Sequence, residues 1–297
     1  MVFKVCDGQI YIGDLFILVM AKRVEEELIR LKNVSKYYPM GDSIVKALNH
    51  IELKVFKGEF VAIMGPSGSG KSTAMNLVGS LDVPTHGTIY LDKGDIAELS
   101  ESDLAQVRGR KIGFIFQSFN LINNLTVKEN VMLPMMFQGT SIEERAERAE
   151  ELLKLVELHD RMDHYPGEIS GGQMQRVAIA RSLANDPEVI LADEPTGNLD
   201  TKTGAIVMDF LKKLNDQGKT VIMVTHDPDL AKEYANVIYW LLDGELEKVT
   251  KRVGKTFKDV TKKVTRNSVP SKLGTKVPSS SGKKKEMKKE AKANGAK

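Results

Sequence analysis

The most constraining feature of the chain is a glycine-rich loop between a short apolar run and a helical stretch. The loop, Gly65-Pro66-Ser67-Gly68-Ser69-Gly70-Lys71-Ser72, fits the spacing G-x-x-x-x-G-K-[ST] and follows the run Phe60-Val61-Ala62-Ile63-Met64. We expect this run to be a buried strand and the residues up to Gly79 to form a helix. The fold therefore has to contain a strand, loop and helix unit.

Such a loop has the chemistry of a phosphate site. Glycines allow backbone N–H groups to surround phosphate oxygens, and the start of a helix adds positive potential. Lys71 would supply a charge to the β- and γ-phosphates, while Ser72, followed by Thr73, would offer a hydroxyl to Mg²⁺. The alternative is a glycine turn with a surface lysine, which the flanking strand and helix argue against.

Two adjacent carboxylates follow a second apolar run. Asp193 closes Val189-Ile190-Leu191-Ala192, where a nucleotidase needs a carboxylate to hold Mg²⁺. Glu194 comes next and would polarise the attacking water as a general base. A helix-capping or solvated acid is the alternative for Glu194.

A second glycine pair opens a different helix. In Ser170-Gly171-Gly172-Gln173 the serine caps the first turn and Gln173 reaches back, as Glu129 does to Thr126 and Glu144 to Ser141. The free N–H groups of such a helix start make a ready phosphate site. An ordinary glycine-rich helix start is the alternative.

Together these motifs resemble those of ATP-binding cassette (ABC) ATPases, over roughly Leu28 to Val249. Three further segments match in order, namely Gln117, Asn198-Leu199-Asp200 and His226. Ile169 stands where the family usually has leucine, which is a small, volume-conserving departure. The resemblance implies an α/β fold of the P-loop NTPase type, with a mixed RecA-like core sheet, an antiparallel β subdomain and a helical subdomain. It also implies ATP hydrolysis with ATP and Mg²⁺ as ligands.

The resemblance also assigns roles to individual residues. Two cassettes would pack head to tail, so that Ser170, Gly172 and Gln173 of one chain contact the γ-phosphate held by the other. Gln117 would sense Mg²⁺ or water, and His226 would hydrogen-bond the γ-phosphate and orient Glu194 and water.

Two assignments leave alternatives open. Tyr38 matches the aromatic residue that stacks on adenine, but Tyr37 is adjacent, and a packed surface aromatic is also possible. Asp200 matches an aspartate at the dimer interface and is equally an N-cap for a helix from Thr201.

Along the chain we expect three parts. Residues 1–27 form an N-terminal extension, residues 28–249 the ATPase domain with a helical subdomain at about 120–185, and residues 250–297 a basic, disordered tail. A hairpin from Val237 to Val249, turning at Asp243-Gly244, should end the folded body.

Charge separates the tail from the body. Residues 251–297 carry 16 Lys and Arg against 3 Asp and Glu, whereas the other residues have a net negative balance. Within the tail, Val253, Phe257, Val260 and Val264 fall on one helical face, which suggests contact with anionic lipid; a solvated tail is the alternative. Nucleic acid is a less favoured partner, since phosphate attraction alone is nonspecific.

The sequence also bears on location. No unbroken apolar run reaches the roughly 18 residues that a spanning helix requires, and Cys6 is the single cysteine. The resemblance is to the lipoprotein-releasing, macrolide-export and cell-division group, which implies a homodimer under a separate membrane permease. We therefore expect a peripheral protein on the cytoplasmic side of the membrane. A cell-division type regulator and a soluble nucleic-acid-associated ATPase are the alternatives.

Overall fold

The computed structural model describes residues 5–6, 9–10, 26–41 and 43–261. Two short strands, β1 (Val5–Cys6) and β2 (Gln9–Ile10), pair antiparallel near the start of the chain. The rest of the predicted extension before residue 26 and the tail after residue 261 lie outside the described residues. Within the part that is described, no helix combines the length and apolar character needed to cross a bilayer.

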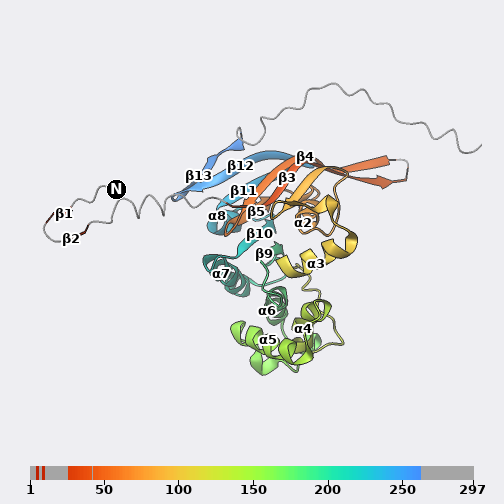
Figure 1. Ribbon diagram of the computed structural model, residues 1–297, viewed down its shortest axis with the longest axis vertical. Coiled ribbons are helices and arrows are strands. Elements are labelled where there is room, and N and C mark those ends of the chain that lie inside the picture. Colours follow the sequence, from red (N-terminus) through yellow and green to blue (C-terminus); the bar gives the residue numbers. More distant parts are fainter. Residues whose placement is uncertain (1–4, 7–8, 11–25, 42, 262–297) are drawn as a thin grey trace, which may run out of the picture. The chain divides into compact units, whose positions relative to one another are not determined.

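A seven-stranded mixed sheet forms the centre of the molecule (Figure 1). The order is β13-β12-β11-β5-β10-β9-β8, in which β11, β5, β10, β9 and β8 run parallel to one another, β12 is antiparallel to β11, and β13 is antiparallel to β12. The bounds are β5 (Phe60–Met64), β8 (Ile112–Ile115), β9 (Val189–Asp193), β10 (Thr220–Thr225), β11 (Val237–Leu242), β12 (Glu245–Val253) and β13 (Thr256–Asp259). The apolar runs of the sequence are thus the buried parallel strands, as predicted.

The central strands supply side chains to two hydrophobic cores. In β5, Val61 and Ile63 face one core while Phe60, Ala62 and Met64 face the other, because successive side chains point to opposite faces. All five residues are buried. A strand covered on both faces has no need for polar alternation, which explains its continuous apolar run.

The first core lies under a four-stranded antiparallel sheet. Its order is β4-β3-β6-β7, with bounds β3 (Glu27–Met40), β4 (Ser43–Phe56), β6 (His86–Leu91) and β7 (Gly94–Asp95). Helix α2 (Lys71–Val78) packs between the two sheets through Ala74, Met75 and Leu77. Gly79 caps α2, as the sequence predicted.

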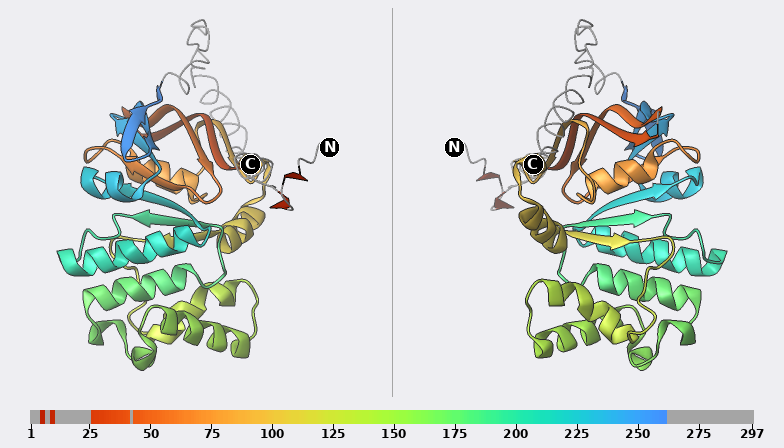
Figure 2. Two further views of the ribbon diagram at one scale, coloured as in Figure 1. Left: turned by 90° about the vertical axis from the view of Figure 1, so that its left-hand side faces the viewer. Right: turned by 90° about the vertical axis from the view of Figure 1, so that its right-hand side faces the viewer.

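Helices cover the opposite face of the central sheet. Figure 2 shows α4, α5 and α6 together at the end of the molecule away from the four-stranded sheet. The bounds are α3 (Glu101–Lys111), α4 (Val127–Phe137), α5 (Ile142–Leu155), α6 (Gly171–Ser182), α7 (Thr201–Asp216) and α8 (Pro228–Tyr234), with short 3-10 turns at Ile96–Glu98, His159–Arg161 and Pro166–Glu168. Helices α4 to α8 pack on this opposite face, whereas α3 packs against the first core through Leu104 and Val107. All three predicted capping boxes are present, at the starts of α4, α5 and α6.

The folded body continues past the boundary expected near Val249. Strand β12 runs to Val253, the chain turns at Gly254, and β13 pairs back with Arg252 opposite Phe257. The guanidinium of Arg252 lies 4.8 Å from the centre of the Phe257 ring. The helical face predicted for Val253, Phe257 and Val260 is therefore wrong for the described part, because this segment forms a hairpin. Its fourth member, Val264, lies outside the described residues.

Candidate functional site

The glycine loop is held in shape by close backbone contacts. A Cβ atom on Gly65 would lie 2.2 Å from the carbonyl oxygen of Leu241, and one on Gly70 would lie 2.4 Å from that of Ala47. Gly70 also has φ +97°, a left-handed conformation that disfavours any side chain. Gly70 caps α2 without a side-chain hydrogen bond, so the first N–H groups of the helix stay available to an anion.

Lys71 folds back over this loop. Its Nζ donates to the carbonyl oxygens of Gly65 at 2.9 Å and Pro66 at 2.8 Å, and the residue is only 8% exposed. The ammonium is therefore fixed beside the loop N–H groups. A cation held beside free backbone N–H groups is suited to phosphate oxygens.

Asp193 and Glu194 stand at the carboxyl end of β9. Burial raises the pKa of Asp193, the Glu194 carboxylate adds to that rise, and Lys71 opposes it. Two adjacent carboxylates near one lysine leave negative charge that a divalent cation would stabilise.

Glu194 is held in an unusual backbone conformation. It has φ +42°, although its N–H still donates to the carbonyl oxygen of Val224 at 2.9 Å. Its Oε1 lies 3.0 Å from Nδ1 of His226, an exposed side chain that follows β10. Backbone strain of this kind tends to occur at functional sites. Here the strained residue is Glu194, and it contacts His226; these are the two residues predicted to act on water and the γ-phosphate.

Lys71, Glu194, His226 and most of the glycine loop border one pocket of about 700 Å³, whereas Asp193 and Gly65 do not line it. Its lining comes from the glycine loop, the first turn of α2, part of β4, and the side chains of Glu194 and His226. The lining residues are Val45, Lys46, Ala47, Pro66, Ser67, Gly68, Gly70, Lys71, Ser72, Thr73, Glu194 and His226. Tyr38 lies at its edge, because it pairs across the hairpin with Val45 and its hydroxyl interacts with Thr73. Tyr37 instead donates to Asn49 at 3.0 Å.

Gln117 lies in the loop after β8. Its carbonyl oxygen accepts from Nδ2 of Asn198 at 2.8 Å. A Cβ on Gly197 would lie 2.7 Å from Nε2 of Gln117, so the amide packs against the backbone that leads to Asp200. The structure therefore brings Gln117 next to the segment after the carboxylates, although Gln117 does not line the 700 Å³ pocket.

Arg181 of α6 holds the same loop two residues further on. Its Nη1 donates to Asn120 O at 2.5 Å and its Nη2 to Phe119 O at 2.7 Å. Both loop residues have positive φ, +60° for Phe119 and +51° for Asn120. The guanidinium is desolvated, which lowers the pKa of Arg181. These bonds fix a strained loop to the helix that begins at Gly171.

The second glycine pair is separate from the pocket. Ser170 caps α6 by accepting from the N–H of Gln173 at 3.3 Å, and none of the residues from Ser170 to Gln173 lines the pocket. A Cβ on Gly172 would lie 2.3 Å from Cγ2 of Thr203, which places this helix start beside α7. Asp200 caps α7 and is exposed; hydrogen bonds from Thr203 lower the pKa of Asp200.

The donor set suits Mg²⁺. Ser72 offers a hydroxyl, Asp193 a carboxylate and Gln117 an amide oxygen, and Mg²⁺ is commonly held by one or two carboxylates together with substrate phosphates and water. In the described ranges, no three His, Cys, Asp or Glu side chains gather as a metal cluster. Such a cluster is not needed where a phosphate supplies part of the coordination.

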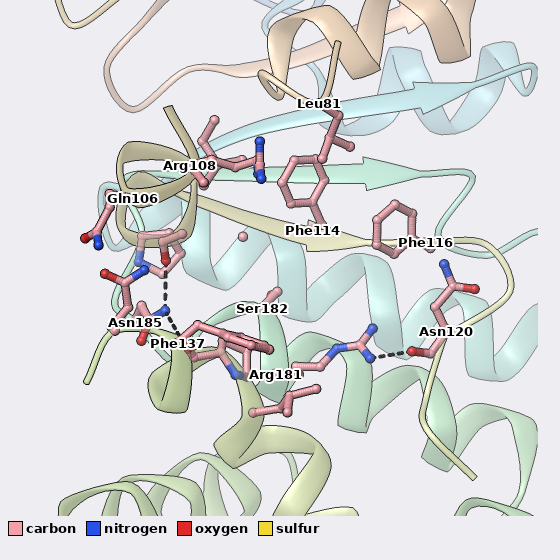
Figure 3. A pocket seen from close by; sticks show the side chains of 18 of the residues that line it. Leu81, Gln106, Arg108, Phe114, Phe116, Asn120, Phe137, Arg181, Ser182 and Asn185 are labelled. Carbon is pink, nitrogen blue, oxygen red and sulfur yellow. Dashed lines mark hydrogen bonds between the residues drawn. The ribbon is translucent and has the colours of Figure 1, made fainter. Parts of the chain in front are cut away.

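A second pocket, of about 630 Å³, lies between β8 and the helices α3, α4 and α6 (Figure 3). Phe114, Phe116 and Phe137 give it apolar walls, and Phe137 is 70% exposed. Arg108 and Arg181 also line it, and its described lining contains no acidic residue. Figure 3 shows the bond from Arg181 to Asn120, so this pocket borders the loop that carries Gln117.

Sequence reasoning missed the residues that brace the site. Arg181 and Asp82 act through partners that are distant along the chain, since 61 residues separate Arg181 from Asn120 and 44 separate Asp82 from the Tyr38 hydroxyl that it accepts from. No local pattern marks such contacts. The left-handed conformation of Glu194 likewise has no signal in its residue type.

The arrangement defines a nucleotide-binding cassette, and comparisons with known proteins agree. A family model described as "ABC transporter" matches residues 48–197. The uncharacterized ABC transporter ATP-binding protein MJ0796 of Methanocaldococcus jannaschii is 53% identical over 232 residues, which cover 76% of this chain and 98% of that protein. This chain belongs to the ABC transporter family and is an ATP-hydrolysing cassette.

Two further relatives extend the comparison. The macrolide export ATP-binding/permease protein MacB of Campylobacter jejuni is 47% identical over 225 residues, covering 76% of this chain and 34% of that protein. A solved dimeric post-hydrolysis state of MJ0796, bound to ADP and Pi, is 51% identical with a TM-score of 0.71. It covers 76% of this chain and 100% of that chain.

Proposed function

We propose that the chain is the ATP-hydrolysing subunit of an ABC transporter, which dimerises on ATP and drives a separate membrane permease from the cytoplasmic side. The proposed dimer rests on one observation. The helix start at Ser170 to Gln173 has the capping and glycines of a phosphate site, yet it does not line the pocket of its own chain. A second copy, placed head to tail, would bring it to the phosphates held by the glycine loop.

Within each site the residues divide the work. The loop N–H groups and Lys71 bind the β- and γ-phosphates, and Ser72, Asp193 and Gln117 would hold Mg²⁺, which would supply charge neutralisation at the phosphates when bound. Glu194 takes a proton from the attacking water, and His226 orients Glu194 through the contact at 3.0 Å. Asp200 lies at the dimer interface, near the partner's glycine loop.

Mixing two inactive variants tests the shared site. Lys71→Ala removes the phosphate cation, while Gly171→Asp places a negative charge at the start of α6, where the nearest atom to an added Cβ is 3.8 Å away. Each homodimer should be inactive. A mixed dimer contains one site with an intact loop and an intact helix start, so mixing should restore ATP hydrolysis that neither variant has alone.

The control is a mixture of Lys71→Ala with Glu194→Gln, because both changes lie on the loop side of the site. A mixed dimer of these two variants has one defect in each site and should stay inactive. If the first mixture also stays inactive while both variants bind a wild-type partner, the head-to-tail arrangement is rejected.

The second pocket is the proposed docking site for the permease. It is large, apolar and open through Phe137, and large exposed apolar patches mark interaction sites. It also borders the Gln117 loop, so an occupant would touch the segment that follows a nucleotide-site residue (Figure 3). MacB is named as an ATP-binding/permease protein, which supports a permease as the partner.

Phe137→Glu tests the docking site, with Ile142→Glu as the matched control. Both residues are exposed, at 70% and 64%, but Ile142 on α5 does not line the pocket. With the tagged protein in its native host, Phe137→Glu should lose a co-purifying membrane protein while ATP hydrolysis persists. Equal recovery from both variants would reject this docking site, and a nucleic acid or soluble complex in place of a permease would reject the membrane function.

Two narrower points belong to the same proposal. The basic residues after Val249 would attract anionic lipid beside the permease, which vesicle co-sedimentation with and without acidic lipid tests.

The substrate would be exported or extracted, as in the macrolide-export and lipoprotein-releasing group. A signalling role without transport predicts a permease partner but no substrate flux in reconstituted vesicles.

A further inference from the structure

Tyr38 is held by a small network that the roles described above do not use. Its hydroxyl donates to Oδ2 of Asp82 at 2.8 Å. The Nζ of Lys36 donates to Oδ1 of the same carboxylate at 2.5 Å and lies 5.0 Å from the centre of the Tyr38 ring. One carboxylate therefore fixes the end of the ring, and one ammonium covers its face.

Asp82 is itself well anchored. Its Oδ1 also accepts from the N–H of Val83 at 2.7 Å, and Lys36 donates to the carbonyl oxygen of Val83 at 2.8 Å. Although burial alone would raise it, the hydrogen bonds from Lys36 and Tyr38 lower the pKa of Asp82, so the carboxylate is ionised at neutral pH. Lys36 is 12% exposed in its side chain and Asp82 26%.

The network ties the ring to the helix that carries the phosphate site. Asp82 follows α2, whose first residue is Lys71. The Tyr38 hydroxyl also interacts with Thr73 in the first turn of α2. The hydroxyl end of the ring is thus held by one residue in α2 and one that follows it, near the pocket that Thr73 and Val45 line.

We propose that Asp82 and Lys36 are positioning residues, which preorganise the Tyr38 ring as the platform for the nucleotide base. This inference rests on the proposed role of Tyr38 as the base contact. A ring that is ordered before binding loses less conformational freedom when a base stacks on it. Asp82 acts through the Tyr38 hydroxyl, and the face of the ring away from Lys36 receives the base.

The test compares Tyr38→Phe, Asp82→Ala and the double variant, with Tyr37→Phe as the matched control. Tyr37 is the neighbouring tyrosine, and its hydroxyl bonds to Asn49 instead. We expect each single change to raise KM for ATP roughly three- to tenfold, the scale of immobilising one side chain, with kcat unchanged. The double variant should match Asp82→Ala alone, because Asp82→Ala already removes the bond that Tyr38→Phe removes. Tyr37→Phe should match the wild type.

Inorganic tripolyphosphate separates positioning from general damage, because it occupies the phosphate loop without a base. Its inhibition constant should not change in Tyr38→Phe or Asp82→Ala. A parallel loss of tripolyphosphate binding would show damage to the loop, and additive effects in the double variant would show that Asp82 acts elsewhere. Either result overturns the proposal, as does a lower KM, which would mean that the bond holds the ring away from the base.

Tyr38→Ala tests separately whether Tyr38 contacts the base at all, which is the assignment on which the positioning role rests. If Tyr38→Ala leaves KM for ATP unchanged, Tyr38 is not the base contact and the proposed function loses that residue. If Tyr38→Ala raises KM but Tyr38→Phe and Asp82→Ala do not, the base contact stands and the positioning role is rejected.

Discussion

The two glycine-rich segments of the site differ in what their own chain demands of them. In the loop, Gly65 and Gly70 leave no room for a side chain, and Gly70 has a left-handed backbone. At the start of α6, Gly171 has an ordinary helical backbone, and the nearest atom to an added Cβ is 3.8 Å away. The fold explains the loop glycines but not Gly171.

This difference indicates which of the two segments contacts a partner molecule. The glycine loop is completed by its own chain, because its backbone contacts, Lys71 and the Asp193 and Glu194 carboxylates all come from nearby elements. The start of α6 is equally well ordered through the cap at Gln173, but among the described residues no hydrogen bond joins the N–H groups of Gly171 and Gly172 to their own chain. A well-capped helix start whose first N–H groups have no partner is suited to a phosphate held by a second molecule. The following changes test that contrast.

The largest effect should come from Glu194→Gln on the loop side. The amide cannot accept a proton from water, so hydrolysis should fall by about 10²- to 10⁴-fold while ATP still binds. Phosphate release measures the rate, and size-exclusion chromatography with ATP should show the accumulated dimer. Hydrolysis at the wild-type rate would remove Glu194 from its role.

A pair of alanine substitutions compares the two glycine segments directly. Gly70→Ala should destabilise the protein by at least about 1–2 kcal/mol, because φ is positive and the Cβ meets a carbonyl oxygen. Gly171→Ala should be neutral or stabilising by up to about 1 kcal/mol, as alanine is the better helix former. Urea unfolding measures both. Equal losses would mean that Gly171 also serves its own chain's fold.

Ser170→Ala separates capping from partner contact, with Ser141→Ala as its control. Both serines cap a helix through the same type of box, so each change should cost about 1 kcal/mol of unfolding free energy. Only Ser170→Ala should also lower ATP hydrolysis. A similar loss of activity in both variants would assign the effect to helix stability.

The smallest effect should be a change in pH dependence at Asp193. Because the folded-state pKa of Asp193 is raised, the folded chain retains a proton that the unfolded chain releases first. Stability of the nucleotide-free protein should therefore fall as pH rises from about 3.8 through the folded pKa, and the penalty is complete above it. Asp193→Asn should remove this fall and be the more stable at neutral pH, and a wild-type slope in the variant would contradict it. Denaturation at several pH values measures this.

Local patterns were sufficient for much of the fold. The glycine spacing, the apolar runs and the three capping boxes each depend on residues close together in the chain, and the structure has them where they were predicted. The candidate site residues also lie at strand ends and helix starts, as their motifs indicated. Their roles remain predictions until the variants above are measured.

Long-range contacts and ambiguous spacing account for the rest. Arg181 and Asp82 become informative only when folding brings them to Asn120 and Tyr38. The apolar spacing of Val253, Phe257 and Val260 fits a helix, but the turn at Gly254 places Val253 and Phe257 in a pair of strands. Periodicity alone does not separate these two outcomes.

The division of β5 between two cores has a consequence for how the molecule unfolds. Because alternate residues of this strand face opposite cores, neither core keeps its wall when the strand is lost. The sheet and helix layers are therefore not independent folding units. We expect amides of β5 to exchange with solvent only through global opening, and denaturant to reveal one cooperative transition for both layers.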